Sequence, residues 1–273
     1  MSEVKIIVPT DFQNPASTAL QQAIMLAKRT SGSLALLHIA DEDHPEKSED
    51  KMTALCESVL KEHGITCHHM VEHGDIYEDI GRITDRHNAT FMVIGTHGLR
   101  GLAQHLFGAR IIKVLNSVSV PAIVVQDETP VQKDFRKILL PVDDIESFEE
   151  KVRSTIPFAQ WSGAEVMLYA IAHPMKNEKK LREHIELSRK LLNEANVSFE
   201  ETEESPTVFS AGIAKQTLNF AKTWGADLIV ISLCDTENMA NINEADCERI
   251  LTNDDHTAVL VAPEKLVKQK LFG

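Results

Sequence analysis

FMVIGTHG, at residues 91–98, is the stretch that decides the fold of this chain. Its first four residues are apolar and predict a buried parallel strand, and residues 110–115 predict a helix. The glycines between them, Gly95, Gly98 and Gly108, let backbone amides approach an anion without obstruction by side chains. The positive end of the following helix adds a field of the right sign. The stretch is therefore a candidate phosphate-binding loop between a strand and a helix.

The chain repeats itself, because KIIVPTD at residues 5–11 returns as KILLPVD at residues 137–143. Three further apolar runs recur in the same order, at 33–40 and 164–171, at 91–94 and 228–231, and at 122–125 and 258–261. Four matches at a nearly constant offset indicate two copies of one domain. We predict a first domain over residues 1–128, a polar linker over 129–136 that contains Pro130, and a second domain over 137–273.

Each copy alternates short apolar runs with stretches of helical spacing. In the first copy, strands are predicted at 4–8, 33–39, 66–71, 91–95 and 122–125, and helices at 16–31, 49–63 and 76–87. Near-continuous apolar strands separated by helices predict a parallel sheet that is covered on both faces. The predicted fold is therefore α/β, with two tandem, doubly wound, five-stranded parallel sheets. Ligands of such sheets bind at the carboxyl ends of strands, where Asp11, Ile39 and Gly95 are expected.

Composition and charge exclude several classes of partner. Apolar residues make up 43% of the 273 residues and the net charge is -13. Both halves are acidic, with 12 basic and 17 acidic residues up to Lys133 and 16 and 24 after it. This argues against nucleic acid or an anionic membrane as the main partner. No apolar stretch approaches the roughly 20 residues of a membrane span, and no signal peptide is expected. Because the four cysteines form no paired framework, we expect a reducing, cytoplasmic location.

The motifs resemble those of the universal stress protein family. They are Pro9-Thr10-Asp11, Leu37-His38-Ile39, Gly95-Thr96-His97-Gly98, Gly108-Ala109 and Val120-Pro121-Ala122. The resemblance implies a Rossmann-like fold of the adenine nucleotide alpha hydrolase type, with ATP as ligand, with or without Mg. It places Asp11, after Pro9 and Thr10, and Ile39 at the nucleoside. It places the phosphates at Gly95, His97, Gly98, Gly108, Ala109 and Arg110.

Position 109 departs from the family pattern, which has Ser or Thr there. Ala109 offers no hydroxyl to the phosphates. A lost hydrogen bond to a charged group costs about 1.5–3 kcal/mol, or roughly one to two decades of affinity. Arg110 is adjacent and could offset part of this loss. We therefore expect binding that is weakened rather than abolished.

The second copy lacks the glycine motif. Ser232 stands where Gly95 would recur, and no glycine occurs from Ser232 through Pro263. The corresponding loop carries several carboxylates, which would repel a triphosphate, although Asp143 repeats Asp11. We expect ATP to be bound by the first domain only, and the second domain to serve packing, pairing or another ligand. An acidic metal site is the alternative, but scattered carboxylates are usually a solvated face.

Histidine and cysteine gather around the third predicted strand. His63, Cys67, His68, His69 and His73 fall within eleven residues. Strand alternation puts Cys67 and His69 on one face, and both are usual zinc ligands. Because two ligands need partners from elsewhere, we favour solvated histidines on an edge or surface strand over a zinc site.

The leading hypothesis is a nucleotide-responsive binding module of the stress response, without catalytic residues. Its two copies would pair through their last strands and imitate a homodimer within one chain, and we also consider a true homodimer. One alternative is a slow ATP hydrolase, for which the sequence offers only Asp11 and His97. Another is a nucleotide-free dimerisation scaffold, and either alternative could include a zinc site.

Overall fold

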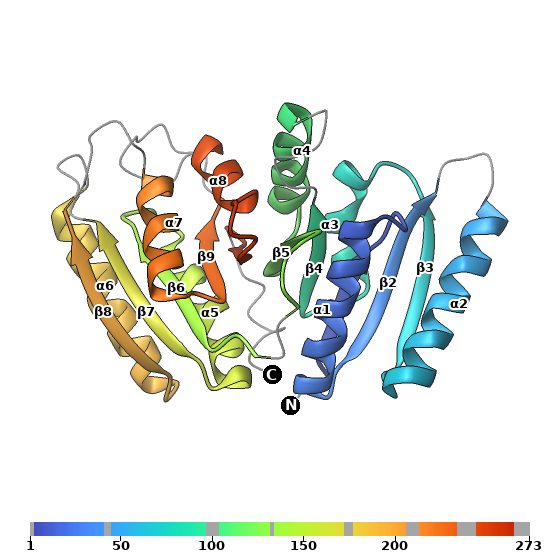
Figure 1. The fold of residues 1–273 in the computed structure, drawn as a ribbon, viewed down its shortest axis with the longest axis horizontal. Helices are drawn as coiled ribbons and strands as arrows, with labels where there is room; N and C mark the ends of the chain where they lie inside the picture. Colours follow the sequence, from blue (N-terminus) through green and yellow to red (C-terminus); the bar gives the residue numbers. More distant parts are fainter. Residues whose placement is uncertain are drawn as a thin grey trace.

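A single mostly parallel sheet between two layers of helices forms the protein (Figure 1). The computed structural model describes residues 3–40, 45–96, 104–131, 134–171, 177–205, 213–233 and 244–264. At residues 40, 45–47, 76–78, 104–110 and 244 only the backbone is described. This α/β architecture with alternating strands and helices confirms the predicted fold class.

The first half contains five strands and four helices in regular alternation. They are β1 (Lys5–Pro9), α1 (Asn14–Thr30), β2 (Ser33–Ala40), α2 (Pro45–His63), β3 (Cys67–His73), α3 (Ile76–Arg86), β4 (Phe91–Thr96), α4 (Gln104–Ser117) and β5 (Ala122–Gln126). The predicted strands and the first three predicted helices agree with these bounds to within a few residues. The last helix differs, because α4 begins at Gln104, six residues before the predicted start. Gly108 therefore lies inside a helix, where glycine is tolerated at a cost of about 1 kcal/mol.

The elements of the second half follow the same order as those of the first half. They are β6 (Lys137–Val142), α5 (Phe148–Ser162), β7 (Glu165–Ile171), α6 (Glu178–Glu194), β8 (Ser198–Glu204), α7 (Ile213–Trp224), β9 (Leu228–Ser232), α8 (Glu244–Leu251) and β10 (Ala258–Ala262). The parallel register within each half follows the sequence repeat, since Ile6 pairs with Phe91 of β4 in the first half and Ile138 pairs with Leu228 of β9 in the second.

The strands join into one ten-stranded sheet in the order β3-β2-β1-β4-β5-β10-β9-β6-β7-β8. All pairings within each half are parallel. The halves meet where β5 and β10 pair antiparallel, with Val124 opposite Val259. The sheet thus runs continuously through the chain, and only the central pairing reverses direction.

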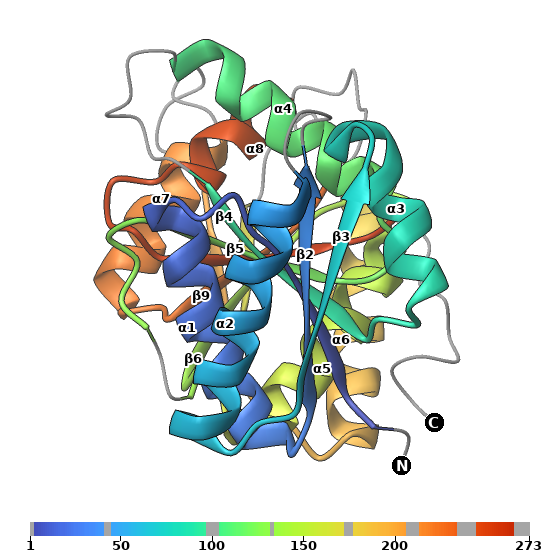
Figure 2. The same cartoon turned by 90° about the vertical axis from the view of Figure 1, so that its right-hand side faces the viewer.

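Two hydrophobic cores lie on the two faces of the sheet. One core packs the sheet against α1, α2, α5 and α6, and the other packs it against α3, α4, α7 and α8. Figure 2 shows α1 and α2 on one side of β1 and β2, with α3 and α4 on the other side. Each core contains residues from both halves, so burial of apolar surface stabilises the two halves together.

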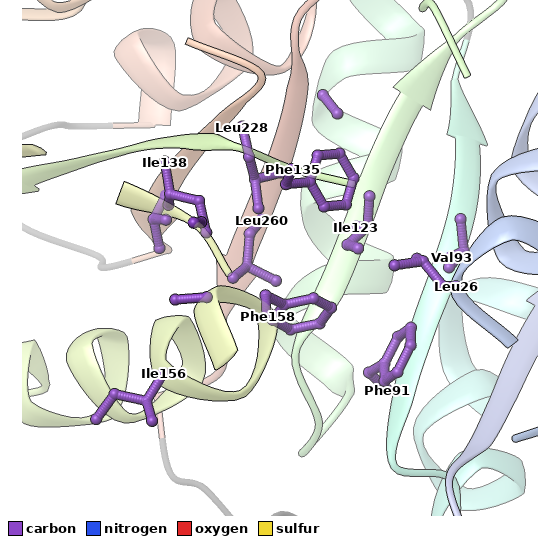
Figure 3. Packing of buried hydrophobic residues seen from close by; sticks show 14 of the residues in the cluster. Leu26, Phe91, Val93, Ile123, Phe135, Ile138, Ile156, Phe158, Leu228 and Leu260 are labelled. Carbon is purple, nitrogen blue, oxygen red and sulfur yellow. The ribbon is translucent and has the colours of Figure 1, made fainter. Parts of the chain in front are cut away.

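Aromatic side chains link the halves within the first of these cores (Figure 3). Phe158 of α5 meets Phe91 of β4 edge to face, with ring centroids 5.1 Å apart. Trp161 lies 5.7 Å from Phe91. Phe135, inside the predicted linker, is fully buried, and its amide donates to the Ser162 hydroxyl at 3.2 Å. The connection between the halves is therefore anchored in the core at this residue.

Candidate functional site

The strand order creates one topological switch point in each half. In the first half β1 lies between β2 and β4, and the helices that follow β1 and β4 cover opposite faces of the sheet. The connections thus diverge at the carboxyl ends of β1 and β4, which is where open α/β sheets bind ligands. Pro9, Thr10 and Asp11 follow or end β1, and Gly95 and Thr96 end β4. The structure therefore brings the early Asp motif and the start of the glycine motif to the same edge.

Hydrogen bonds fix the backbone beyond the end of β1. The Thr10 amide donates to the Leu37 carbonyl at 2.8 Å, which ties the turn to β2. The His38 ring nitrogen Nδ1 donates to the Thr10 carbonyl at 2.8 Å. The Asp11 carboxylate accepts from the Gln13 amide at 3.0 Å and remains exposed. These contacts hold Asp11 at the edge with its carboxylate open to a ligand.

Phe12 is a residue of this site that sequence reasoning missed. Its φ of 63° is a left-handed conformation, which is rare for an aromatic residue and is typical of functional or strained turns. The residue is 37% exposed, its ring centroid lies 4.7 Å from that of His38, and the Lys51 ammonium lies 5.1 Å from the same centroid. The sequence carries no signal for positive φ at a non-glycine residue, so this aromatic surface becomes visible only in the fold.

Gly95 has a packing role that the sequence did not reveal. A Cβ at this position would lie 2.2 Å from the Pro15 carbonyl oxygen and 2.8 Å from the Ala16 amide nitrogen. The first turn of α1 therefore lies so close to the end of β4 that a side chain at position 95 would overlap its backbone. The absence of a side chain at Gly95 is thus explained by the contact between α1 and β4.

Gly95→Ala is expected to destabilise the chain by about 1–3 kcal/mol, because the new methyl overlaps backbone rather than a flexible side chain. Urea unfolding of the variant measures this. Gly64→Ala is the matched control, since a Cβ there meets nothing within 4 Å and only its φ of 67° is strained. Wild-type stability of Gly95→Ala would contradict the packing role.

The remaining predicted phosphate residues are only partly described. His97 and Gly98 lie outside the described residues. Gly108, Ala109 and Arg110 lie in the first half of α4, where the backbone alone is described. Ile39 is half-buried at the end of β2, next to the Thr10 turn. The roles of these residues at a phosphate or nucleoside stay predictions.

The equivalent switch point of the second half, between β6 and β9, is closed by a buried ion pair. Asp143, which repeats Asp11, is 5% exposed, and its Oδ2 lies 2.5 Å from the Lys151 ammonium. Lys151 lies on α5 and is fully buried. The corresponding residue of the first half, eight positions after Asp11, is Ala19. The second half thus has a lysine at the position where the first half has an alanine.

Further contacts cover the same edge of the second half. The His184 ring nitrogen Nδ1 donates to the Asp143 carbonyl at 2.6 Å. The His184 ring stacks on Phe148 at 4.5 Å. Asp144 is 8% exposed and accepts from the Asn177 amide at 2.8 Å. The second half therefore has its early aspartates engaged internally, whereas Asp11 is exposed.

The histidine and cysteine residues of β3 do come together with α2. His69 lies 3.0 Å from Glu49, and Cys67 and His69 both contact Cys56 through side-chain hydrogen bonding. Within the described ranges, no group of three or more His, Cys, Asp or Glu side chains is arranged to hold a metal ion. The predicted candidates Cys67 and His69 therefore share a face, as expected, without forming a recognisable metal centre there.

Comparison with known proteins finds one family model that is similar to the first half of the chain. Residues 4–126 match the sequence model of the universal stress protein family. A universal stress protein from Archaeoglobus fulgidus is 16% identical, with a TM-score of 0.72 over 95% of this chain and 96% of that one. A putative universal stress protein from Pseudomonas aeruginosa is 17% identical, with a TM-score of 0.64 over 96% of this chain and 94% of that one.

A further solved structure is similar to about half of this chain, whereas curated sequences show no similarity. A universal stress protein in complex with cAMP is 14% identical, with a TM-score of 0.37 over 48% of this chain and 99% of that one. No curated protein sequence matches the chain. Among the described helices, none combines the length and the apolar character that a membrane crossing requires.

Proposed function

We propose that the chain is a nucleotide-responsive binding module of the stress response, because residues 4–126 match the sequence model of the universal stress protein family. In this proposal the first half binds an adenine nucleotide at the carboxyl ends of β1, β2 and β4. The observation that carries the proposal is the contrast between the two switch points. Asp11 is exposed at the first, and Lys151 neutralises and covers Asp143 at the second.

Each part of the nucleotide has a candidate partner at the first switch point. Asp11 is held with an exposed carboxylate, which suits the hydroxyls of a ribose. Phe12 follows Asp11 in the chain and its ring lies 4.7 Å from the His38 ring, so we assign the base to this aromatic surface and to the backbone near Ile39. The segment after Gly95 leads toward the amino end of α4, whose dipole favours phosphate. Backbone amides near His97 and Gly98, together with Ala109 and Arg110, are proposed to complete the phosphate site.

The pairing of β5 with β10 gives this site an asymmetric setting. One half that carries the motif is joined to one half that lacks it, as in a dimer with a single active protomer. We propose that the nucleotide changes the segment between β4 and α4, and that a protein partner binds differently as a result. A homodimer of chains and a cytoplasmic location belong to the same proposal. The three described cysteines are all free, which suits a reducing compartment.

Ala109→Ser is expected to raise the affinity for Mg-ATP by roughly one to two decades, since it restores a hydroxyl to a charged ligand. Isothermal titration of the full chain measures the dissociation constant, and the wild-type protein is the matched control that lacks only this hydroxyl. Gly98→Val is expected to abolish binding. Ser232→Ala, at the second switch point, is expected to leave affinity and the stoichiometry of one unchanged.

The same samples test the alternatives. Absence of binding at millimolar ATP, cAMP and AMP in both wild type and Ala109→Ser would refute the proposal and favour a nucleotide-free scaffold. Steady phosphate release that disappears in His97→Ala would instead show an ATP hydrolase. Binding that survives Gly98→Val and disappears in Ser232→Ala would place the nucleotide in the second half and contradict the proposed site.

A further inference from the structure

Two free cysteines from neighbouring elements meet at the outer edge of the first half. Cys56 lies on α2 and is 8% exposed, and Cys67 begins β3, the edge strand of the sheet. Their thiols are hydrogen-bonded to each other, and neither belongs to a disulfide. Cys67 is only half-buried. Figure 1 shows α2 alongside β3 at the end of the sheet, away from the junction between the halves.

A histidine and a carboxylate extend the pair into a chain of four groups. The His69 side chain also hydrogen-bonds to Cys56. The His69 Nε2 atom lies 3.0 Å from a carboxylate oxygen of Glu49, and Glu49 is more than half exposed. Glu49, His69, Cys56 and Cys67 therefore form a continuous path from solvent to a buried sulfur. This arrangement is typical of thiols that an adjacent imidazole activates.

We propose that Cys56 and Cys67 are a modification site, an oxidisable dithiol that a hydroperoxide converts to an intramolecular disulfide. Electrostatics supports the division of roles between the thiols. The hydrogen bond from Cys67 lowers the pKa of Cys56, and the charge of His69 adds to this effect. The same bond, together with burial, raises the pKa of Cys67. We assign Cys56, the thiol that His69 contacts, as the nucleophile, and Cys67, its neighbour on β3, as the thiol that resolves the intermediate.

The reaction balances in two steps. The Cys56 thiolate attacks one oxygen of the hydroperoxide, the O–O bond breaks, and the departing alkoxide takes a proton from His69 to leave as alcohol. Cys56 is then a sulfenic acid. The Cys67 sulfur attacks the Cys56 sulfur, and the hydroxyl leaves with the thiol proton as water. Two thiols have lost two electrons to the hydroperoxide, and a disulfide joins α2 to β3.

The test uses the full chain with Cys234→Ser and Cys247→Ser, so that only the pair can react. After treatment with hydrogen peroxide or cumene hydroperoxide, intact mass is expected to fall by the mass of two hydrogens. Peptide mapping is expected to find Cys56 joined to Cys67, and dithiothreitol to reverse the change. In Cys67→Ser, a sulfenic acid at Cys56 is expected to persist and react with dimedone. His69→Gln is expected to slow oxidation by roughly a hundredfold, because it removes the imidazole that donates a proton to the departing alkoxide.

Two outcomes would overturn the proposal. The first is that Cys56 and Cys67 stay fully alkylatable after oxidation of the folded protein, which would leave them as packing residues of the core. The second is that the purified protein retains one zinc ion per chain through these thiols and resists hydroperoxide. His63→Gln is the control for His69→Gln, because His63 contacts Lys28 rather than the thiols. Equal slowing in both variants would remove His69 from the mechanism.

Discussion

Lys151→Ala is expected to destabilise the protein by about 3–5 kcal/mol, because it leaves the Asp143 carboxylate buried without its counter-ion. Lys151 is fully buried and Asp143 is 5% exposed, so water cannot take over the role of the ammonium. The other carboxylate oxygen of Asp143, Oδ1, is buried and has no hydrogen-bond partner among the described residues. The ammonium therefore provides most of the compensation that this carboxylate has.

The measurement is chemical unfolding at neutral pH, read as a change in midpoint at constant slope. Lys179→Ala is the matched control, because the Lys179 side chain is 88% exposed and its ion pair with Glu183 is long, at 3.7 Å. That variant is expected to unfold at the same denaturant midpoint as the wild type. The double variant Lys151→Met with Asp143→Leu removes both charges and is expected to recover most of the lost stability.

This design separates the charge pair from simple packing. A large loss in Lys151→Ala together with recovery in the double variant shows that an unpaired carboxylate is the cause. Equal losses in both variants would mean that the volume of the lysine stem, and not its charge, stabilises α5 on the sheet. A loss below about 1 kcal/mol in Lys151→Ala would contradict the buried ion pair itself.

Lys151 also marks the limit of what the sequence could predict. The repeat of KIIVPTD as KILLPVD predicted two related halves, and the parallel strands of the first half were placed to within a few residues. These features follow from apolar periodicity, which local sequence records directly. That a lysine on α5 lies in the core is a tertiary fact. The sequence hint was that Lys151 falls at helical spacing from Phe148 and Phe158, which are residues on the buried face of the helix.

Contacts between distant segments account for the other features that the sequence did not predict. The approach of Pro15 to Gly95, the left-handed Phe12 and the early start of α4 depend on how helices meet strands. The sequence predicted the strand ends that carry Asp11, Ile39 and Gly95, because each follows an apolar run. It could not predict that the glycine at β4 is required by packing, since a glycine for an anion and a glycine for a helix look alike in sequence.

Phe158→Ala is expected to cost about 3–5 kcal/mol and to weaken the coupling between the two halves. Phe158 is fully buried on α5 of the second half, and its ring meets Phe91 of the first half at 5.1 Å and Trp161 at 5.2 Å. Figure 3 shows this ring between Leu260 and Ile123 on one side and Phe91 on the other. Truncation opens a cavity on both sides of the junction, so each half loses contact with the other.

Phe148→Ala is the matched control for this prediction. It removes the same side chain from the same helix at the same burial, but Phe148 stacks on His184 within the second half. Both variants are expected to lower stability, and only Phe158→Ala is expected to speed hydrogen exchange in β4 as well as in β9. Peptide-resolved exchange measures this, because local opening free energies follow the cooperative units of a fold. Protection of β4 that falls equally in both variants would show that the sheet pairing of β5 with β10, rather than the aromatic contact, couples the halves.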